Sequence, residues 1–191
     1  MRTLEENIKK FGEGSRFEAR KISAENLQTM LEAVSYTPST SNAQPWEIIL
    51  TETNTGKERL IGTLLDPQFR PSKGDNAKTF SWILQAPLIL TIAVDTIRAQ
   101  AKFGMNGASV YSLIDIGSAV QNILLTAYSL GIQTTIIREF KSETVQDVLG
   151  LPKHINPVLF LIMGYSAAIP LEKPRLSLTD IVHRESWENR Y

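Results

Sequence analysis

A stretch of small polar residues separates a helical pattern from an apolar, strand-like segment. It runs from Tyr36 to Leu50 and reads Y-T-P-S-T-S-N-A-Q-P-W-E-I-I-L. Between Pro38 and Pro45, five side chains carry hydroxyl or amide groups without net charge: Ser39, Thr40, Ser41, Asn42 and Gln44. Pro38 and Pro45 stiffen this loop, because each proline fixes its own φ and restricts the preceding residue. The pattern predicts a binding surface for a flat, polar, weakly charged molecule, and an ordinary turn rich in serine and asparagine is the alternative.

A second candidate site lies in residues 12–20, which read G-E-G-S-R-F-E-A-R. A glycine-rich turn followed by arginine can hold a phosphate through backbone N–H groups and a forked guanidinium. Arg16 and Arg20 are the candidate residues here, although these residues taken alone favour the alternative of a surface loop with solvated arginines. The glycines do not form a dinucleotide fingerprint, because no strand precedes them and the third glycine is missing.

Several reactive groups are absent from the sequence or poorly placed in it. The chain has no cysteine, which removes thiolate nucleophiles and cysteine metal ligands. Neither His154 nor His183 forms a metal-ligand motif with a nearby carboxylate, so we expect no metal site. We therefore expect a bound cofactor to supply the chemistry, while the protein supplies binding and orientation and no catalytic side chain.

The composition also limits the partners and the location that we expect. The 20 basic and 20 acidic residues cancel, so nothing points to nucleic acid. The first residues are charged and do not resemble a signal peptide. No apolar run approaches the roughly 18 residues of a membrane helix. We expect one domain over residues 1–191, cytoplasmic and without a membrane partner.

Apolar periodicity predicts four strands interleaved with at least five helices, which is an α+β or α/β layered fold. The expected strands cover residues 46–51, 88–94, 134–137 and 158–163. The expected helices cover residues 3–11, 56–65, 77–85, 113–130 and 142–149, with one more between an N-cap at Ser23 and Pro38. The helix at 113–130 has the clearest period and is expected at the centre of the fold.

Two segments fit neither period. Residues 66–78 are expected to form a long loop, a candidate lid, and residues 95–112 are expected to include a mobile loop that roofs a pocket. Three aromatic residues in or beside these segments are candidates for a substrate pocket, with a plain core role as the alternative: Phe69, Phe103 and Tyr111.

Four stretches, in order along the chain, resemble the nitroreductase family. They are P-S-T-S-N-A-Q-P-W at 38–46, G-D-N at 74–76, D-I-G-S-A-V-Q-N-I-L-L-T-A at 115–127, and L-I-M-G-Y at 161–165, which K-P-R follows at 173–175. One departure concerns the R-R-S-x-R-like motif with which the family usually opens. Here that region reads F-G-E-G-S-R-F-E-A-R, which leaves the phosphate ligand open.

The resemblance implies a three-layer α/β/α sandwich with a mixed, mostly antiparallel sheet around a central helix. It implies a homodimer with FMN at the interface, and a domain-swapped tail, residues 167–191, wrapped over the partner. The expected flavin ligands, contributed by both chains, are Pro38, Ser39, Thr40, Asn42, Gln44, Asn76, Ile137, Arg138 and Glu139. As ligands of the FMN phosphate, the resemblance implies Lys173, Arg175 and Arg16. If the N-terminal motif aligns in another register, Lys10 or Arg20 takes the place of Arg16. Asn122 is assigned to helix packing.

The activity that the resemblance implies is an NAD(P)H-dependent flavin oxidoreductase acting on nitroaromatics or quinones. The nicotinamide would give hydride to the flavin N5 and leave, and the acceptor would take the same place in a ping-pong cycle. Two alternatives remain: a specialised flavin dehydrogenase or oxidase with one substrate, and a non-catalytic flavin-binding or storage protein.

Overall fold

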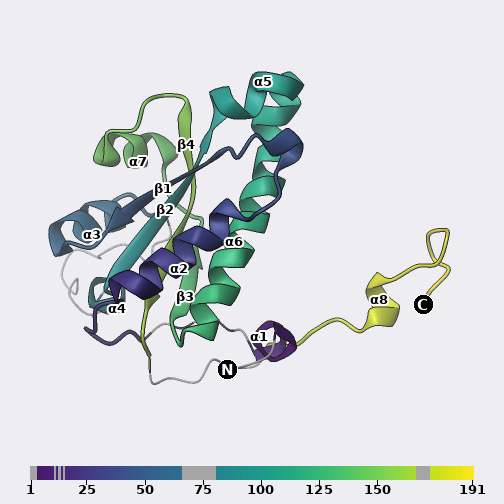
Figure 1. The fold of residues 1–191 in the computed structure, drawn as a ribbon, viewed down its shortest axis with the longest axis horizontal. Helices are drawn as coiled ribbons and strands as arrows, with labels where there is room; N and C mark the ends of the chain where they lie inside the picture. Colours follow the sequence, from purple (N-terminus) through teal and green to yellow (C-terminus); the bar gives the residue numbers. More distant parts are fainter. Residues whose placement is uncertain (1–3, 11, 13, 15, 66–80, 167–172) are drawn as a thin grey trace.

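Strands that are apolar on both faces require helices on both sides of their sheet. The computed structural model, which describes residues 4–10, 12, 14, 16–65, 81–166 and 173–191, shows this arrangement (Figure 1). Its sheet has the order β1-β2-β4-β3, and every neighbouring pair is antiparallel. The strands are β1 (Trp46–Thr51), β2 (Leu88–Asp95), β3 (Gln133–Ile137) and β4 (Ile155–Gly164). No parallel pair occurs among the described strands, so the expected mixed sheet is not found there.

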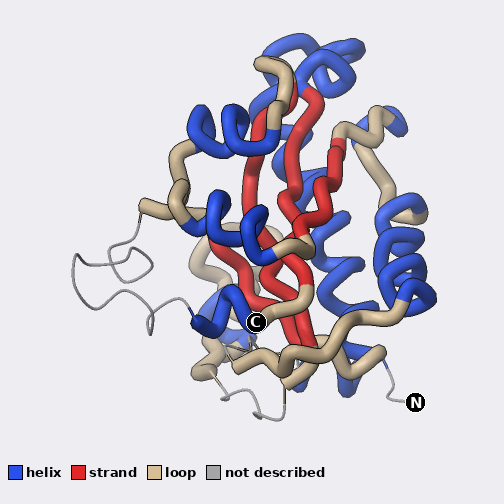
Figure 2. The backbone as a smooth tube through the Cα atoms, turned by 90° about the vertical axis from the view of Figure 1, so that its left-hand side faces the viewer, coloured by secondary structure: helices blue, strands red, loops and turns tan. Residues whose placement is uncertain are grey.

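Two layers of helices cover the sheet (Figure 2). On one face, α2 (Ala24–Ser35) and α6 (Ser112–Ser129) pack against alternate sheet residues such as Leu90 and Leu161. The other face packs against α3 (Asn54–Ile61), α4 (Ser81–Gln85) and α7 (Ser142–Leu149), through residues that include Ile89 and Phe160. The α+β class, and the three layers that the family resemblance implied, are thus confirmed.

Most helix and strand boundaries agree with those predicted from the apolar periodicity of the sequence. β1 has the predicted bounds, and α1 (Leu4–Lys10) lies inside the predicted 3–11. Ser23 caps α2, since its Oγ accepts from the N–H of Asn26 at 3.2 Å. Gly150 ends α7 in the left-handed conformation with φ 66°, which glycine adopts without steric cost.

The helix predicted over 56–65 is shifted along the chain. α3 begins at Asn54 because the Thr53 side chain accepts from the N–H of Gly56 at 3.1 Å. It ends at Ile61, and Leu64 instead forms an isolated bridge with Phe140. The expected loop at 66–78, with Phe69 and Asn76, and the first residues of the helix expected over 77–85 lie outside the described residues.

The prediction of a loop within residues 95–112 is wrong. This segment forms α5 (Thr96–Asn106) and a π-helical turn, η3 (Gly107–Tyr111), which leads directly into α6. Asp95 caps α5 by accepting from the N–H of Arg98 at 2.9 Å. Glycine reads as a loop signal in sequence, but Gly107 is required here for close packing, since a Cβ on it would lie 2.1 Å from the Ala99 carbonyl oxygen.

The helical run Thr96–Ser129 is the one helix of the described chain that is long and apolar enough to cross a membrane by length and composition. In the fold, 44% of its most apolar window is buried, and the core helix of a soluble protein meets the same criterion.

The described end of the chain, residues 173–191, extends away from the three layers (Figure 1). It contains a short helix, α8 (Leu178–Ile181), with a capping box between Ser177 and Asp180. Beyond α8 the His183 ring stacks on Trp187, with ring centroids 4.4 Å apart. Five large apolar side chains of this segment are exposed: Leu176, Leu178, Ile181, Trp187 and Tyr191.

The buried side chain of Lys57 joins two of the helices that cover the sheet, α3 and α4. It is 3% exposed, and its Nζ donates to the carbonyl oxygens of Leu84 and Ala86, each at 2.8 Å. These bonds tie α3 to α4 (Ser81–Gln85) and to the short link between α4 and β2. Burial lowers the pKa of the Lys57 ammonium from its ordinary value of 10.5.

We expect Lys57→Met to destabilise the fold at pH 7 by about 1–3 kcal/mol, because two buried carbonyl oxygens lose their donor. The folded state binds fewer protons at Lys57 than the unfolded state between the lowered pKa and 10.5, so wild-type stability rises with pH there. Urea unfolding of the wild type and of Lys57→Met from pH 8 upward isolates the contribution of Lys57, since the other titrating groups cancel in the difference between the two free energies of unfolding. If this difference shrinks as the pH rises, the pKa of Lys57 is not lowered in the folded state.

Candidate functional site

A cavity of about 440 Å³ lies between the loop that precedes β1, the helix α5 and the start of α6. One wall is the polar stretch Thr40–Ala43, and the opposite wall comes from α5 and η3. The rings of Phe103 and Tyr111, both lining residues, meet edge to face with centroids 5.4 Å apart and an interplanar angle of 90°. The cavity therefore combines hydroxyl and amide groups on one side with aromatic surface on the other.

Asp115 anchors the first part of the polar loop. This residue on α6 is 5% exposed, and its two carboxylate oxygens accept from the backbone N–H of Thr40 at 3.1 and 3.0 Å. The Thr40 hydroxyl donates to the same carboxylate at 3.1 Å. A buried carboxylate needs such donors, so these bonds fix Thr40 to α6.

The loop beyond Thr40 forms an arch, residues 41–44, with an unusual backbone. Ser41, Asn42 and Gln44 have φ values of 53°, 57° and 46°, in the left-handed region that non-glycine residues seldom adopt. The N–H of Gln44 donates to the Ser39 hydroxyl at 2.9 Å, and its side-chain amide donates to the Asn42 side-chain oxygen at 3.2 Å. Contacts of this kind are required to hold a strained backbone, and strain of this kind gathers at binding sites.

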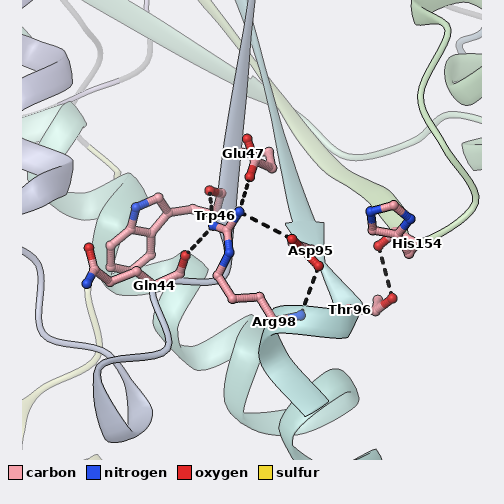
Figure 3. A network of polar contacts seen from close by, with 7 residues as sticks. All are labelled: Gln44, Trp46, Glu47, Asp95, Thr96, Arg98 and His154. Carbon is pink, nitrogen blue, oxygen red and sulfur yellow. Dashed lines mark hydrogen bonds and ion pairs between the residues drawn. The ribbon is translucent and has the colours of Figure 1, made fainter. Parts of the chain in front are cut away.

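Three charged residues line the cavity: Arg98, Lys102 and Asp115. The Arg98 guanidinium forms ion pairs with Glu47 and, at 3.2 Å, with Asp95 (Figure 3). Lys102 makes no hydrogen bond or ion pair within the described part of the chain. Since Asp115 is bound to Thr40, Lys102 is the one lining charge without a partner among the described residues.

The structure brings together only part of the predicted site. Thr40 and Asn42 from the polar stretch line the cavity, as do the two aromatic candidates of the described chain, Phe103 and Tyr111. Pro38, Ser39 and Gln44 belong to the same loop without lining the cavity.

The remaining candidates lie elsewhere in the chain. Ile137 is buried at the end of β3, Arg138 and Glu139 beside it are exposed, and β3 is at the opposite edge of the sheet from β1. Lys173 and Arg175 are in the extended C-terminal segment.

The candidate phosphate ligands near the N-terminus differ in their contacts. Arg16 is exposed and makes no hydrogen bond or ion pair within the described residues. The Arg20 guanidinium lies 4.0 Å from the centroid of the Tyr165 ring, a cation–π contact. The Lys10 side chain, like Phe69 and Asn76, lies outside the described structure.

Sequence reasoning missed the three charged residues of this site, whereas it assigned Asn122, which lies outside the cavity, correctly. Asp115 is the first residue of the D-I-G-S-A stretch but carried no predicted role, and Arg98 and Lys102 lie in the segment for which a loop was predicted. Asn122 was assigned to packing, and its Nδ2 donates to the Thr37 hydroxyl at 2.8 Å and to the Ala33 carbonyl at 3.3 Å, which joins α6 to α2.

Comparison with known proteins identifies the class. The profile of the nitroreductase family matches residues 15–165. The chain belongs to the nitroreductase family.

Three relatives illustrate the similarity. The FMN reductase (NAD(P)H) of Bacillus subtilis is 28% identical over 182 residues, which cover 88% of this chain and 68% of that protein. The solved structure of B. megaterium NfrA2 superposes with a TM-score of 0.81 at 26% identity, covering 98% of this chain and 76% of that one. The structure of the NADPH:FMN oxidoreductase from Vibrio harveyi, complexed with NAD+, superposes with a TM-score of 0.81 at 22% identity. The match covers 97% of this chain and 78% of that one.

Proposed function

We propose that this protein is an NAD(P)H-dependent flavin oxidoreductase that binds FMN and reduces nitroaromatic or quinone acceptors. The observation that carries the proposal is the cavity, in which a strained polar arch faces an aromatic pair in a chain of this family. Relatives named FMN reductase and NADPH-flavin oxidoreductase support the use of flavin and nicotinamide.

The residues of the cavity fit one end of a flavin. A flat ring with polar edges suits the amide of Asn42, the hydroxyls of Thr40 and Ser41, and the aromatic surface of Phe103. When bound, FMN supplies hydride acceptance from the nicotinamide and its return to the acceptor. The chain itself binds and orients the ring through the arch, and the edge-to-face pair Phe103–Tyr111 shapes the entry of the acceptor.

We propose that the complete site needs two copies of the chain. In one copy, the cavity lies beside the loop that leads into β1, whereas Ile137–Glu139 lie at the far edge of the sheet. Phosphate ligation by Arg16, Lys173 and Arg175 also draws on segments outside the cavity.

The surface of a single copy supports the same proposal. Met105, Val110, Leu113 and Ile114 are 72%, 52%, 53% and 61% exposed on the helical run of α5, η3 and α6. A second copy would cover these residues and the apolar side chains of the C-terminal segment.

An anaerobic absorbance titration tests the function. The purified protein, loaded with FMN, should lose the visible flavin bands when NADH or NADPH is added, and the more effective donor identifies the preference. Recovery of the bands with a panel of quinones and nitroaromatics then reports the acceptors. Bands that persist with both donors would favour the non-catalytic alternative, and turnover of a single acceptor would favour the specialised dehydrogenase or oxidase.

The charge of Lys102, which pairs with no other described residue, leads to a prediction about acceptors. Its cation at the cavity should favour acceptors with an acidic substituent, so Lys102→Gln should lower kcat/KM for a nitrobenzoate by about three- to fivefold, the size expected of an exposed ion pair. Turnover of the neutral nitrobenzamide should stay unchanged. Lys153→Gln, at an exposed position that does not line the cavity, is the matched control. Equal losses with both acceptors would rule out charge recognition.

A further inference from the structure

Arg98 joins the polar loop to the helix that forms the opposite wall of the cavity (Figure 3). Its Nη1 donates to the carbonyl oxygen of Gln44 at 2.7 Å and lies 3.5 Å from that of Trp46. Its Nη2 pairs with Glu47 on β1 and with Asp95 at the end of β2. One side chain on α5 therefore holds the exit of the loop and the strand that follows it.

Backbone contacts fix the platform on which Arg98 stands. The N–H of Asp95 donates to the Pro45 carbonyl oxygen at 2.8 Å. The N–H and the hydroxyl of Thr96 both donate to the His154 carbonyl oxygen at 2.9 Å, which ties the first turn of α5 to the start of β4 (Figure 3). The guanidinium thus reaches the loop from a rigid corner of the sheet.

The arch is consequently held at both ends. Asp115 binds the loop at Thr40, before the arch, and Arg98 binds the carbonyl of Gln44 at the arch's last residue. Between these two anchors lie the left-handed residues Ser41 and Asn42, which line the cavity. Backbone strain of this kind persists only where the surrounding contacts determine it.

The charges around Arg98 indicate that it acts through the loop. Glu47 and Asp95 already balance its guanidinium, so it adds little free charge to the cavity. Its bond to the Gln44 carbonyl is charge-assisted and directional, which suits the fixing of a backbone.

We infer that Arg98 is a positioning residue that holds the arch 41–44 in its left-handed form and sets its distance from the aromatic pair on the opposite wall. Only the expected consequence of this role, an effect on flavin binding, rests on the proposed function. The geometry of the arch itself can be measured without any ligand.

The test compares Arg98→Met and Arg98→Lys with the matched control Arg59→Met. Arg59 is also an exposed arginine that donates to a main-chain carbonyl, that of Val148 at 2.7 Å, but it does not line the cavity. Amide exchange of the peptide covering residues 38–46, measured by mass spectrometry on the flavin-free protein, reports the arch, in which the N–H groups of Asn42 and Ala43 donate at 2.9 and 3.1 Å.

We expect exchange of this peptide to accelerate about tenfold in Arg98→Met, as for the loss of one charge-assisted hydrogen bond, less in Arg98→Lys, and not in Arg59→Met. The Kd for FMN, from quenching of flavin fluorescence, should rise by a similar factor in the same order. The thermal midpoint should move equally in the two Met variants.

Each outcome has a distinct meaning. Unchanged exchange in Arg98→Met overturns the positioning role, even if FMN binding weakens, because the side chain would then contact the ligand directly. Faster exchange in a protein whose wild type binds no FMN supports the positioning role and rejects the proposed function.

Discussion

Replacing Gly107 by alanine is expected to lower the free energy of unfolding by about 2–3 kcal/mol, the upper part of the range for an overpacked site. An ideal Cβ at this position lies 2.1 Å from the Ala99 carbonyl oxygen and 3.2 Å from its carbonyl carbon. Both atoms belong to the backbone of α5, so no side-chain rotation can relieve the contact. The helix has to shift, and Phe103 and Tyr111 shift with it.

Urea denaturation measures this loss, and Gly62→Ala provides the control. Gly62 has the right-handed φ of −60°, and its nearest neighbour to a new Cβ is the Arg59 carbonyl oxygen at 3.4 Å. The control should stay within about 0.5 kcal/mol of the wild type. If the two variants are equally stable, the junction of α5 and η3 accommodates a Cβ at position 107 without a loss of folding free energy.

Asp115→Ala is expected to have the largest effect on the site. The change removes the acceptor for the N–H and the hydroxyl of Thr40 and leaves the loop without its first anchor. We expect a loss of stability of about 3 kcal/mol, because bonds to a charged acceptor are broken inside the protein. Under the proposed function, the Kd for FMN should rise by about a hundredfold, since the polar wall of the cavity loses its fixed geometry.

Two further variants separate the causes of this effect. Asp115→Asn keeps an acceptor oxygen for Thr40 and should lie between the wild type and Asp115→Ala in both stability and FMN affinity. Asp147→Ala, an exposed carboxylate on α7, is the control and should change neither quantity. If Asp115→Ala unfolds no more easily than this control, the Thr40 contact does not anchor the loop.

The elements that sequence predicted well are those whose signal is local. The period of α6, the N-cap of α2 and the run of β1 depend on neighbouring residues. α5 was missed because Gly104 and Gly107 are loop signals, and only packing against Ala99 explains the second. The burial of Lys57 was equally hidden, since its acceptors at Leu84 and Ala86 are far away in sequence.

The site shows the same division. Composition located the polar loop, because small polar residues between prolines are typical of turns and binding sites. Phe103 and Tyr111 do line the cavity, but they were named from a predicted loop that is helical in the structure. The anchors Asp115 and Arg98 are far from the loop in sequence, so no local pattern links them to it. Ile137–Glu139 and the basic residues outside the cavity stay a prediction about a second copy of the chain.

The order of the strands has a consequence for how quickly the protein reaches its folded state. The central pair joins β2, which ends at Asp95, to β4, which begins at Ile155, with α5, η3, α6, β3 and α7 between them in the chain. Loop closure over such a separation is slow, so we expect refolding in milliseconds to seconds rather than microseconds. During synthesis, β2 has no central partner until residues 155–164 leave the ribosome. The newly made chain must therefore keep its most apolar strand from other chains until that late stage.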